Sequence, residues 1–300
     1  MKKYFKYLMA VVATAASLVS CQKEIDNPQE NLPESDAKYV YTFALDNAVT
    51  KAFLDSDATG TYTTWEAGDL LGVYTKDANG QGHVNAQCSV DVTTSPVTFK
   101  IHSDVQLSEG NMIYSYFPFM SSETQGQEPD KAYLEVPPYQ WGKMNDMPMA
   151  GVPFSLKENV AAGDVPLGTI HMQNMAGIFQ FNLFSSQASY QGEVVETVHF
   201  AARGDNSYVA GLFGFDLTQG EDLSISGVRS GQSNITVQNQ NASVGSSKED
   251  GGKVNMVVIP GSYIGDLTVT TNKAEYKFTF SSAKSVERSH IKPLNVDLAK

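Results

Sequence analysis

Hydrophobic and polar residues alternate with a period of two along much of the chain after residue 38. Strict alternation places the apolar side chains on one face of a β-strand and leaves the other face for water. No segment keeps a helical period for three turns. The pattern therefore predicts an all-β fold with minor helix, and its clearest strands are expected at residues 39–45, 97–101, 179–183, 276–280 and 294–298.

Turn-forming residues divide these segments. Gly, Asn, Asp and Pro recur between short apolar stretches, which is typical of a β-sandwich or barrel. Residues 254–259 form a continuous apolar run and predict a strand buried on both faces. Residues 121–130 and 230–252 are polar, and we expect loops there, the second a long mobile excursion.

The N-terminus has the pattern of an export signal. Lys2, Lys3 and Lys6 precede an apolar stretch at residues 8–18, which is too short to span a bilayer as a mature helix. Leu18-Val19-Ser20-Cys21 resembles a bacterial lipobox, which implies cleavage before Cys21 and attachment of acyl chains to it. The alternative is an ordinary secreted protein with a chance cysteine.

The chain is long enough for two domains after the signal is removed. Residues 1–20 are expected to be the signal peptide, and the polar residues 21–37 a flexible tether. The remaining residues predict an N-terminal β-sandwich at 38–160 and a C-terminal β-sandwich at 161–300, joined near residues 153–166.

The charge of the chain is acidic. It has 21 Lys and Arg residues and 33 Asp and Glu residues, and loss of the three signal lysines moves the net charge from −12 to −15. This argues against nucleic acid and against adhesion to anionic lipid headgroups. If Cys21 is lipidated, Cys88 is the one thiol left, so packing and not a disulfide must hold the mature protein together.

One segment approaches the spacing of a calcium loop. Asp55, Asp57 and Gly60 are followed by Glu66, which is close to the order of ligands in an EF-hand. An EF-hand requires a helix on each side, whereas residues 65–74 predict a strand. An Asp- and Gly-rich hairpin turn explains the segment better.

Other short motifs carry little chemistry. Arg203-Gly204-Asp205 is an adhesive tripeptide in some ligands, but a turn between strands explains it equally. Ser281 and Lys284 have the Ser-x-x-Lys spacing of penicillin-recognising enzymes without the companion motifs. The five histidines are dispersed, which predicts no zinc site. The sequence therefore predicts a protein that is not an enzyme and has no cofactor, catalytic residue or metal site.

Seven segments follow one another in a fixed order along nearly the whole mature chain: Thr50-Lys51-Ala52-Phe53, residues 65–74 (WEAGDLLGVY), 113–118 (IYSYFP), 136–140 (VPPYQ), 171–183, 257–260 (VVIP) and 294–298. Taken together in this order, they resemble the fimbrillin family of Bacteroidetes, the subunits of type V pili.

The resemblance implies two tandem transthyretin-like β-sandwich domains and a role in assembly. In the family a trypsin-like protease excises the first strand, and the open groove accepts a strand from the next subunit. Lys51 stands where the family has arginine before the excision point, so Lys51 and Ala52 are the implied processing site. Leu294, Val296 and Leu298 have the period of a donor strand.

The implied partners are other pilus subunits, in a homo- or hetero-polymer, and the outer membrane through the lipid anchor. A host or bacterial surface ligand is a further expected partner, nucleic acid is not, and the expected location is a fimbrium at the cell surface. Stalk, anchor and tip roles remain open. The alternative is a surface glycan-binding lipoprotein with Tyr139 and Trp141 as aromatic platforms, although burial of Trp141 is the expected arrangement.

Overall fold

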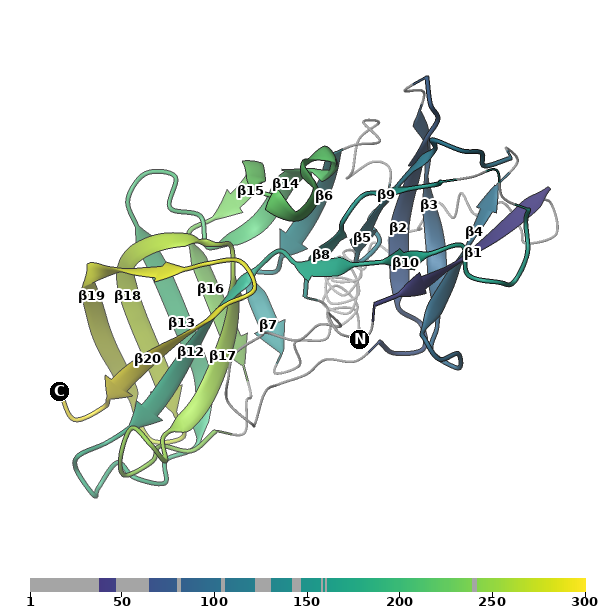
Figure 1. Ribbon diagram of the computed structural model, residues 1–300. Coiled ribbons are helices and arrows are strands. Elements are labelled where there is room, and N and C mark those ends of the chain that lie inside the picture. Colours follow the sequence, from purple (N-terminus) through teal and green to yellow (C-terminus); the bar gives the residue numbers. More distant parts are fainter. Residues whose placement is uncertain are drawn as a thin grey trace, which may run out of the picture. The chain divides into compact units, whose positions relative to one another are not determined.

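The computed structural model describes residues 38–46, 65–79, 82–103, 106–121, 131–141, 147–157, 159, 161–238 and 242–300 (Figure 1). In these ranges the protein is all-β, and its one helical element is the 3-10 helix η2, Leu217–Asp222. The fold class predicted from the period of two is confirmed. Cys21, Lys51 and Ala52 lie outside the described residues, as do the tether and most of the loop expected at 121–130.

A first group of strands forms one nine-stranded sheet in the order β10-β1-β4-β3-β2-β5-β8-β11, with β9 paired to β5. The sheet folds over itself at β3, which pairs with β2 along most of its length and with β4 at its last two residues. Its strands are β1 (Tyr39–Leu45), β2 (Leu70–Lys76), β3 (Gly82–Asp91), β4 (Thr98–Ser103), β5 (Met112–Phe117), β8 (Met149–Gly151), β9 (Phe154–Ser155), β10 (Thr169–Ile170) and β11 (Met172–Asn174).

A second group forms three smaller sheets, in the orders β17-β12-β20, β19-β18-β13-β16-β7 and β15-β14-β6. Its strands are β6 (Lys131–Val136), β7 (Tyr139–Trp141), β12 (Gly177–Phe184), β13 (Val195–Arg203), β14 (Ala210–Asp216), β15 (Ile225–Gln232), β16 (Asn234–Gln238), β17 (Gly252–Val258), β18 (Gly261–Thr271), β19 (Glu275–Val286) and β20 (Ile291–Asp297).

The chain order and the sheet order interleave. Strands β6 and β7 pair with β14 and β16 of the second group, and the chain then returns to the first group for β8 to β11. The chain therefore passes between the two groups three times. All described residues belong to one compact unit, and the division at residue 160 stays a prediction.

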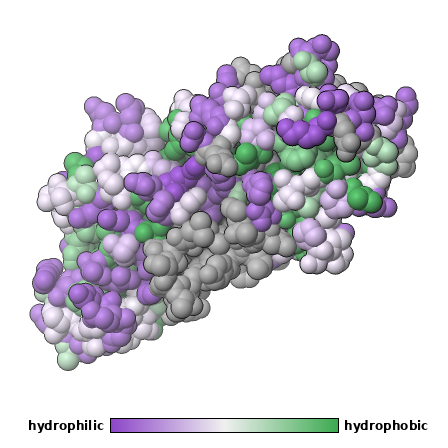
Figure 2. Space-filling model, viewed as in Figure 1, coloured by the Kyte–Doolittle hydropathy of each residue, from purple (hydrophilic) through white to green (hydrophobic). Residues whose placement is uncertain are grey.

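Two hydrophobic clusters hold these sheets together. The smaller one lies inside the folded nine-stranded sheet and joins Phe43 and Phe99 of one layer to Phe117 and Met149 of the other. The larger one fills the second group and extends to Tyr116 of β5. On the face shown in Figure 2 most described residues are hydrophilic or neutral, with hydrophobic ones in small patches. Both clusters are thus packed cores in the manner of a β-sandwich.

Three local features agree with the residue types found there. Trp65 is buried and meets Phe117 edge to face, with ring centroids 5.1 Å apart, so it covers one end of a core. Gly68 has a φ of 101° in the turn that leads into β2, a conformation that glycine adopts without strain. Strands β5 and β17 end before Pro118 and Pro260, as expected of a residue that cannot donate to a ladder.

The mobile excursion predicted at residues 230–252 is wrong. Residues up to Gln232 belong to β15, and Asn234–Gln238 form β16, which pairs with β13. Ile235 and Val237 are buried in the larger core. Ile235 and Val237 alternate with polar residues over a short stretch only. The surrounding residues are rich in Ser, Asn and Gln, which is why the sequence pattern predicted a loop.

Gln140 closes one seam between the sheets of the second group. Its side-chain amide donates to the carbonyl of Val257 (2.8 Å) and accepts from the amide of Val257 (3.0 Å). A glutamine side chain thus pairs with the backbone of β17 as a neighbouring strand would. This contact joins β7, at the end of one sheet, to β17, at the end of another.

Two further observations bear on the chemistry of the chain. Cys88 is buried and unpaired, and burial raises the pKa of its thiol to about 12, so the thiol stays protonated and unreactive at neutral pH. Among the residues that the structure describes, no helix is long and apolar enough to cross a membrane.

Replacing Gln140 tests the seam. We expect Gln140→Ala to lower the free energy of unfolding by about 1–3 kcal/mol, because both backbone groups of Val257 lose their partner in a buried position. Urea denaturation measures this. Gln187→Ala is the control, since that side chain is exposed, and it should change stability by less than about 0.5 kcal/mol. Equal effects of the two substitutions would contradict the role of Gln140.

Candidate functional site

Strand β1 has a neighbour along each of its edges. It pairs antiparallel with β4, from Tyr39 opposite Ser103 to Ala44 opposite Thr98, and parallel with β10 at Ala44 and Leu45. The first strand of the described residues is therefore an interior strand, held between residues 98–103 and a segment more than 120 positions downstream. This slot is the candidate functional site.

The backbone bonds of β1 alternate between the two edges. The amide of Leu45 donates to the carbonyl of Val97 (2.8 Å) on the β4 side. On the other side Ala44 donates to Gly168 (2.9 Å), while the carbonyls of Thr42 and Val40 accept from Leu167 (2.9 Å) and Gly163 (2.9 Å). Residues 163–170 thus follow β1 for most of its length. Sequence reasoning missed this segment, because its only strand signal is the two-residue β10.

The side chains of β1 are deeply buried. Tyr41, Phe43 and Leu45 have no exposed surface. The ring of Phe43 stacks on Phe99 (5.7 Å between centroids) and meets Phe154 edge to face (5.8 Å). Burying each of these side chains contributes on the order of 1.5–3 kcal/mol, so the strand is an integral part of the smaller core.

Tyr41 adds a polar contact inside this core. Its hydroxyl accepts a hydrogen bond from the amide of Leu107 (2.8 Å). Burial raises the pKa of Tyr41, and the bond from Leu107 offsets part of that rise. The hydroxyl is therefore neutral in the folded protein and fixes the position of the strand against the loop that follows β4.

The opposite face of β1 is not the water-facing surface that alternation predicted. Thr42 and Ala44 are 2% and 3% exposed, and the Thr42 hydroxyl donates to the Gly163 carbonyl (2.9 Å). The downstream segment also packs tightly: a Cβ on Gly168 would lie 2.2 Å from Cζ of Phe154. Both faces of β1 are therefore buried, the Phe43 face against Phe99 and Phe154 and the Thr42 face with its hydroxyl bonded to Gly163.

The end of β1 carries one ionisable contact. Oδ2 of Asp46 lies 2.7 Å from Nδ1 of His171, which joins the end of β1 to the residue that follows β10. The chain after Asp46 leaves the described residues until Trp65, so the predicted processing residues Lys51 and Ala52 follow this contact in sequence without a described position.

The predicted donor residues lie in the core of their own chain. Leu294, Val296 and Leu298 are 7%, 3% and 4% exposed. Strand β20 pairs parallel with β12 and lies at the end of its sheet. The predicted strand is confirmed, and its use as a donor stays a prediction.

The other motifs do not form sites. Arg203 is paired with Asp266, so the guanidinium of the adhesive tripeptide is engaged within the chain. Ser281 and Lys284 lie on β19 and not at the start of a helix. The calcium-like acids at 55–57 lie outside the described residues. Among the described side chains, no three His, Cys, Asp or Glu residues come together to hold a metal ion.

The predicted burial of Trp141 is wrong. Tyr139 and Trp141 are 65% and 72% exposed on β7. They point away from the face on which Gln140 pairs with β17, because successive side chains of a strand alternate. The glycan-platform alternative stays a prediction, and these two exposed rings are what it rests on.

No family model and no curated protein sequence matches the chain. Among solved structures, a "putative cell adhesion protein" from Bacteroides ovatus is similar over 80% of this chain and 86% of its own, with 12% identity and a TM-score of 0.51. A second protein so described, from Bacteroides uniformis, has 13% identity over 78% of this chain and 89% of its own, with a TM-score of 0.48.

The tip fimbrial protein Mfa3 from Porphyromonas gingivalis, with a C-terminal truncation, has 10% identity over 86% of this chain and 94% of its own, with a TM-score of 0.44. At these identities the Bacteroides ovatus match shows the fold alone. The all-β sandwich fold implied by the resemblance to fimbrillins is confirmed.

Phe43 tests how far the protein depends on β1. We expect Phe43→Ala to cost about 3–5 kcal/mol of unfolding free energy, because it leaves a cavity between Phe99 and Phe154. Tyr39→Ala, at the half-buried start of the same strand, should cost about 1 kcal/mol. Urea denaturation of both variants measures the difference. Similar small costs would mean that β1 is not a core strand.

Proposed function

We propose that this chain is a fimbrillin-like pilus subunit, or a pilus-associated anchor or tip adhesin, exported as a lipoprotein and assembled by β-strand exchange. The observation that carries the proposal is β1, a buried strand held on both edges by the rest of the chain and followed by the predicted processing site. The fold shared with the Bacteroides ovatus protein supports it.

Excision after Lys51 would convert the slot of β1 into an acceptor. Loss of β1 leaves two backbone edges without partners, the edge of β4 that pairs with β1 and the edge of residues 163–170. It also exposes the side chains of Phe99 and Phe154. Unpaired edges beside an apolar groove favour pairing with another chain. The incoming strand gains main-chain hydrogen bonds, and the pockets left by Tyr41, Phe43 and Leu45 select alternating apolar side chains.

The C-terminal strand is the proposed donor. Leu294, Val296 and Leu298 have the period that the groove requires. Because β20 pairs with β12 alone among the described strands, its departure breaks one ladder, whereas departure of an interior strand breaks two. It still exposes three buried side chains, at about 1.5–3 kcal/mol each. Donation is therefore favourable only when the strand enters a groove of comparable burial.

The lipid and the cut act on the same segment. Cys21 precedes β1 and Lys51 follows it, so a cut after Lys51 lets β1 and the acyl chains leave the subunit together. A subunit that keeps the Lys51–Ala52 bond stays attached to the outer membrane. The two fates correspond to a polymerising subunit and to an anchor, and the proposal includes no catalytic role.

Palmitate labelling of cells follows both steps together. In wild-type cells we expect the full-length form to carry label and the form beginning at Ala52 to carry none. Lys51→Ala should accumulate as a labelled full-length protein, because a trypsin-like protease cuts after a basic residue and none remains at that position. Adding Cys21→Ala to it should remove the label. Label that survives Cys21→Ala, or a wild-type protein that is never shortened, contradicts the corresponding step.

A disulfide across β1 and β4 tests strand exchange directly. Val40 and His102 are opposed in the register, and they form a pair without mutual backbone bonds, since the even residues of β1 bond toward residues 163–168. Such pairs have Cα atoms about 4.5 Å apart, within disulfide range. Oxidised Val40→Cys/His102→Cys should be cut after Lys51 yet retain β1 and form no polymer.

Reduction of that variant should restore polymers, as measured by heat-sensitive ladders on gels. Val40→Cys alone is the control, and it should polymerise under both conditions. Equal polymerisation of the oxidised and reduced double variant would show that β1 need not leave, and assembly would then proceed by another surface.

A further inference from the structure

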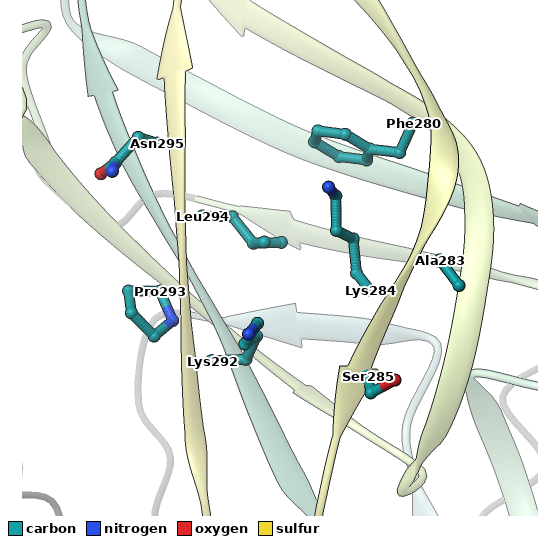
Figure 3. A pocket seen from close by; sticks show the side chains of 8 residues that line it. All are labelled: Phe280, Ala283, Lys284, Ser285, Lys292, Pro293, Leu294 and Asn295. Carbon is teal, nitrogen blue, oxygen red and sulfur yellow. The ribbon is translucent and has the colours of Figure 1, made fainter.

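A second seam between sheets of the second group is not closed by hydrogen bonds between strands. Strands β19 and β20 lie at the ends of two different sheets, and no ladder joins them among the described residues. A cavity of about 430 Å³ lies between them, and its lining includes Phe280, Lys284, Lys292 and Leu294. Figure 3 shows Lys284 of β19 and Leu294 of β20 pointing toward one another across this gap.

Two cations without acidic partners face this cavity. Lys284 lies over the ring of Phe280, with Nζ 5.5 Å from its centroid, and donates to the hydroxyl of Ser282 (3.1 Å). Among the described residues, no carboxylate pairs with it or with Lys292. Elsewhere in this acidic chain lysines are matched with acids, as in Lys100–Asp164 (2.7 Å) and Lys277–Glu275 (2.9 Å). The cavity is therefore an isolated cationic site.

Both free strand edges at the cavity are unsuited to another strand. The Ile178 amide donates to the His290 carbonyl and the Leu298 amide to the Phe184 carbonyl, so even-numbered residues of β20 bond toward β12. Pro293 is odd-numbered, and its nitrogen, which has no hydrogen, is on the open edge. On β19, residues 281–283 bulge opposite Ile264. A bulge, an edge proline and inward lysines all disfavour strand addition.

We propose that this cavity binds an acidic sugar, a carboxylate or sulfate carried on a saccharide ring. The two ammonium groups bind the anion, and the saccharide ring lies against the aliphatic stem of Lys284, which covers the Phe280 ring, and against Leu294. A volume of about 430 Å³ is that of a small-molecule site, and an inorganic anion would leave most of it to water, at about 30 Å³ per molecule. This inference goes beyond the proposed function, because it concerns the monomer, in which β20 still lies beside β19; donation of β20 to a neighbour would open the cavity.

Titration of the unlipidated monomer with glucuronic acid and with glucose 6-sulfate tests the site, with amide chemical shifts of β19 and β20 as the readout. We expect saturable shifts that weaken as NaCl is raised. Lys284→Gln and Lys292→Gln should each weaken binding by about tenfold, since each removes a charged hydrogen-bond donor. Lys277→Gln, a change of the same charge on the outer face of β19, should bind as wild type does.

Several results would overturn the inference. Equal binding of uncharged glucose, wild-type affinity in both lysine variants, or no binding by the wild type would each do so. If sodium sulfate binds as tightly as the sugars, the cavity recognises the anion alone and not the saccharide. New amide-exchange protection along β19 and β20 with an acidic peptide would show that a strand docks there instead. Lys292 is exposed, so its variant stays folded. The readout is binding by the monomer, before any strand is exchanged, which separates this test from that of assembly.

Discussion

The insertion of β1 between two distant segments is the constraint on which the smaller core depends. Its apolar side chains complete the contact between Phe99 and Phe154, and its backbone joins β4 to residues 163–170. Hydrogen bonds and burial both stabilise β1 here. If β1 left, backbone polar groups on two edges would lose their partners and apolar side chains of the core would become exposed. Removal of β1 would therefore destabilise the smaller core through both kinds of interaction.

The two seams between sheets of the second group differ in whether their backbone edges have hydrogen-bond partners. At one, the side-chain amide of Gln140 substitutes for a neighbouring strand and satisfies Val257. At the other, Lys284 and Pro293 leave the edges of β19 and β20 unmatched. A sheet end that is closed by a side chain does not recruit other chains, and neither does one that is blocked by proline and charge. The two seams therefore protect their strand edges differently, one by a side-chain amide and the other by proline and charge.

Much of this architecture follows from local pattern, and the rest does not. Phe179, Phe181 and Leu183 alternate over enough residues to define β12, and Tyr276 to Phe280 define β19. The partner of β1 is not predictable in this way, because Gly163, Leu167 and Gly168 bond to it through backbone groups that every residue has. Trp141 shows the same limit: its exposure follows from the side chain that alternates with it, Gln140, finding a partner 117 residues away.

The three passages of the chain between the strand groups have a mechanical consequence. In tandem domains joined by one linker, a pull along the molecule is carried by a single stretch of backbone. Here β6 and β7 are laid into the second group before the chain returns to the first, so three covalent connections share the tension. Separating the two groups would also require β6 to leave β14, with which it is paired at six positions.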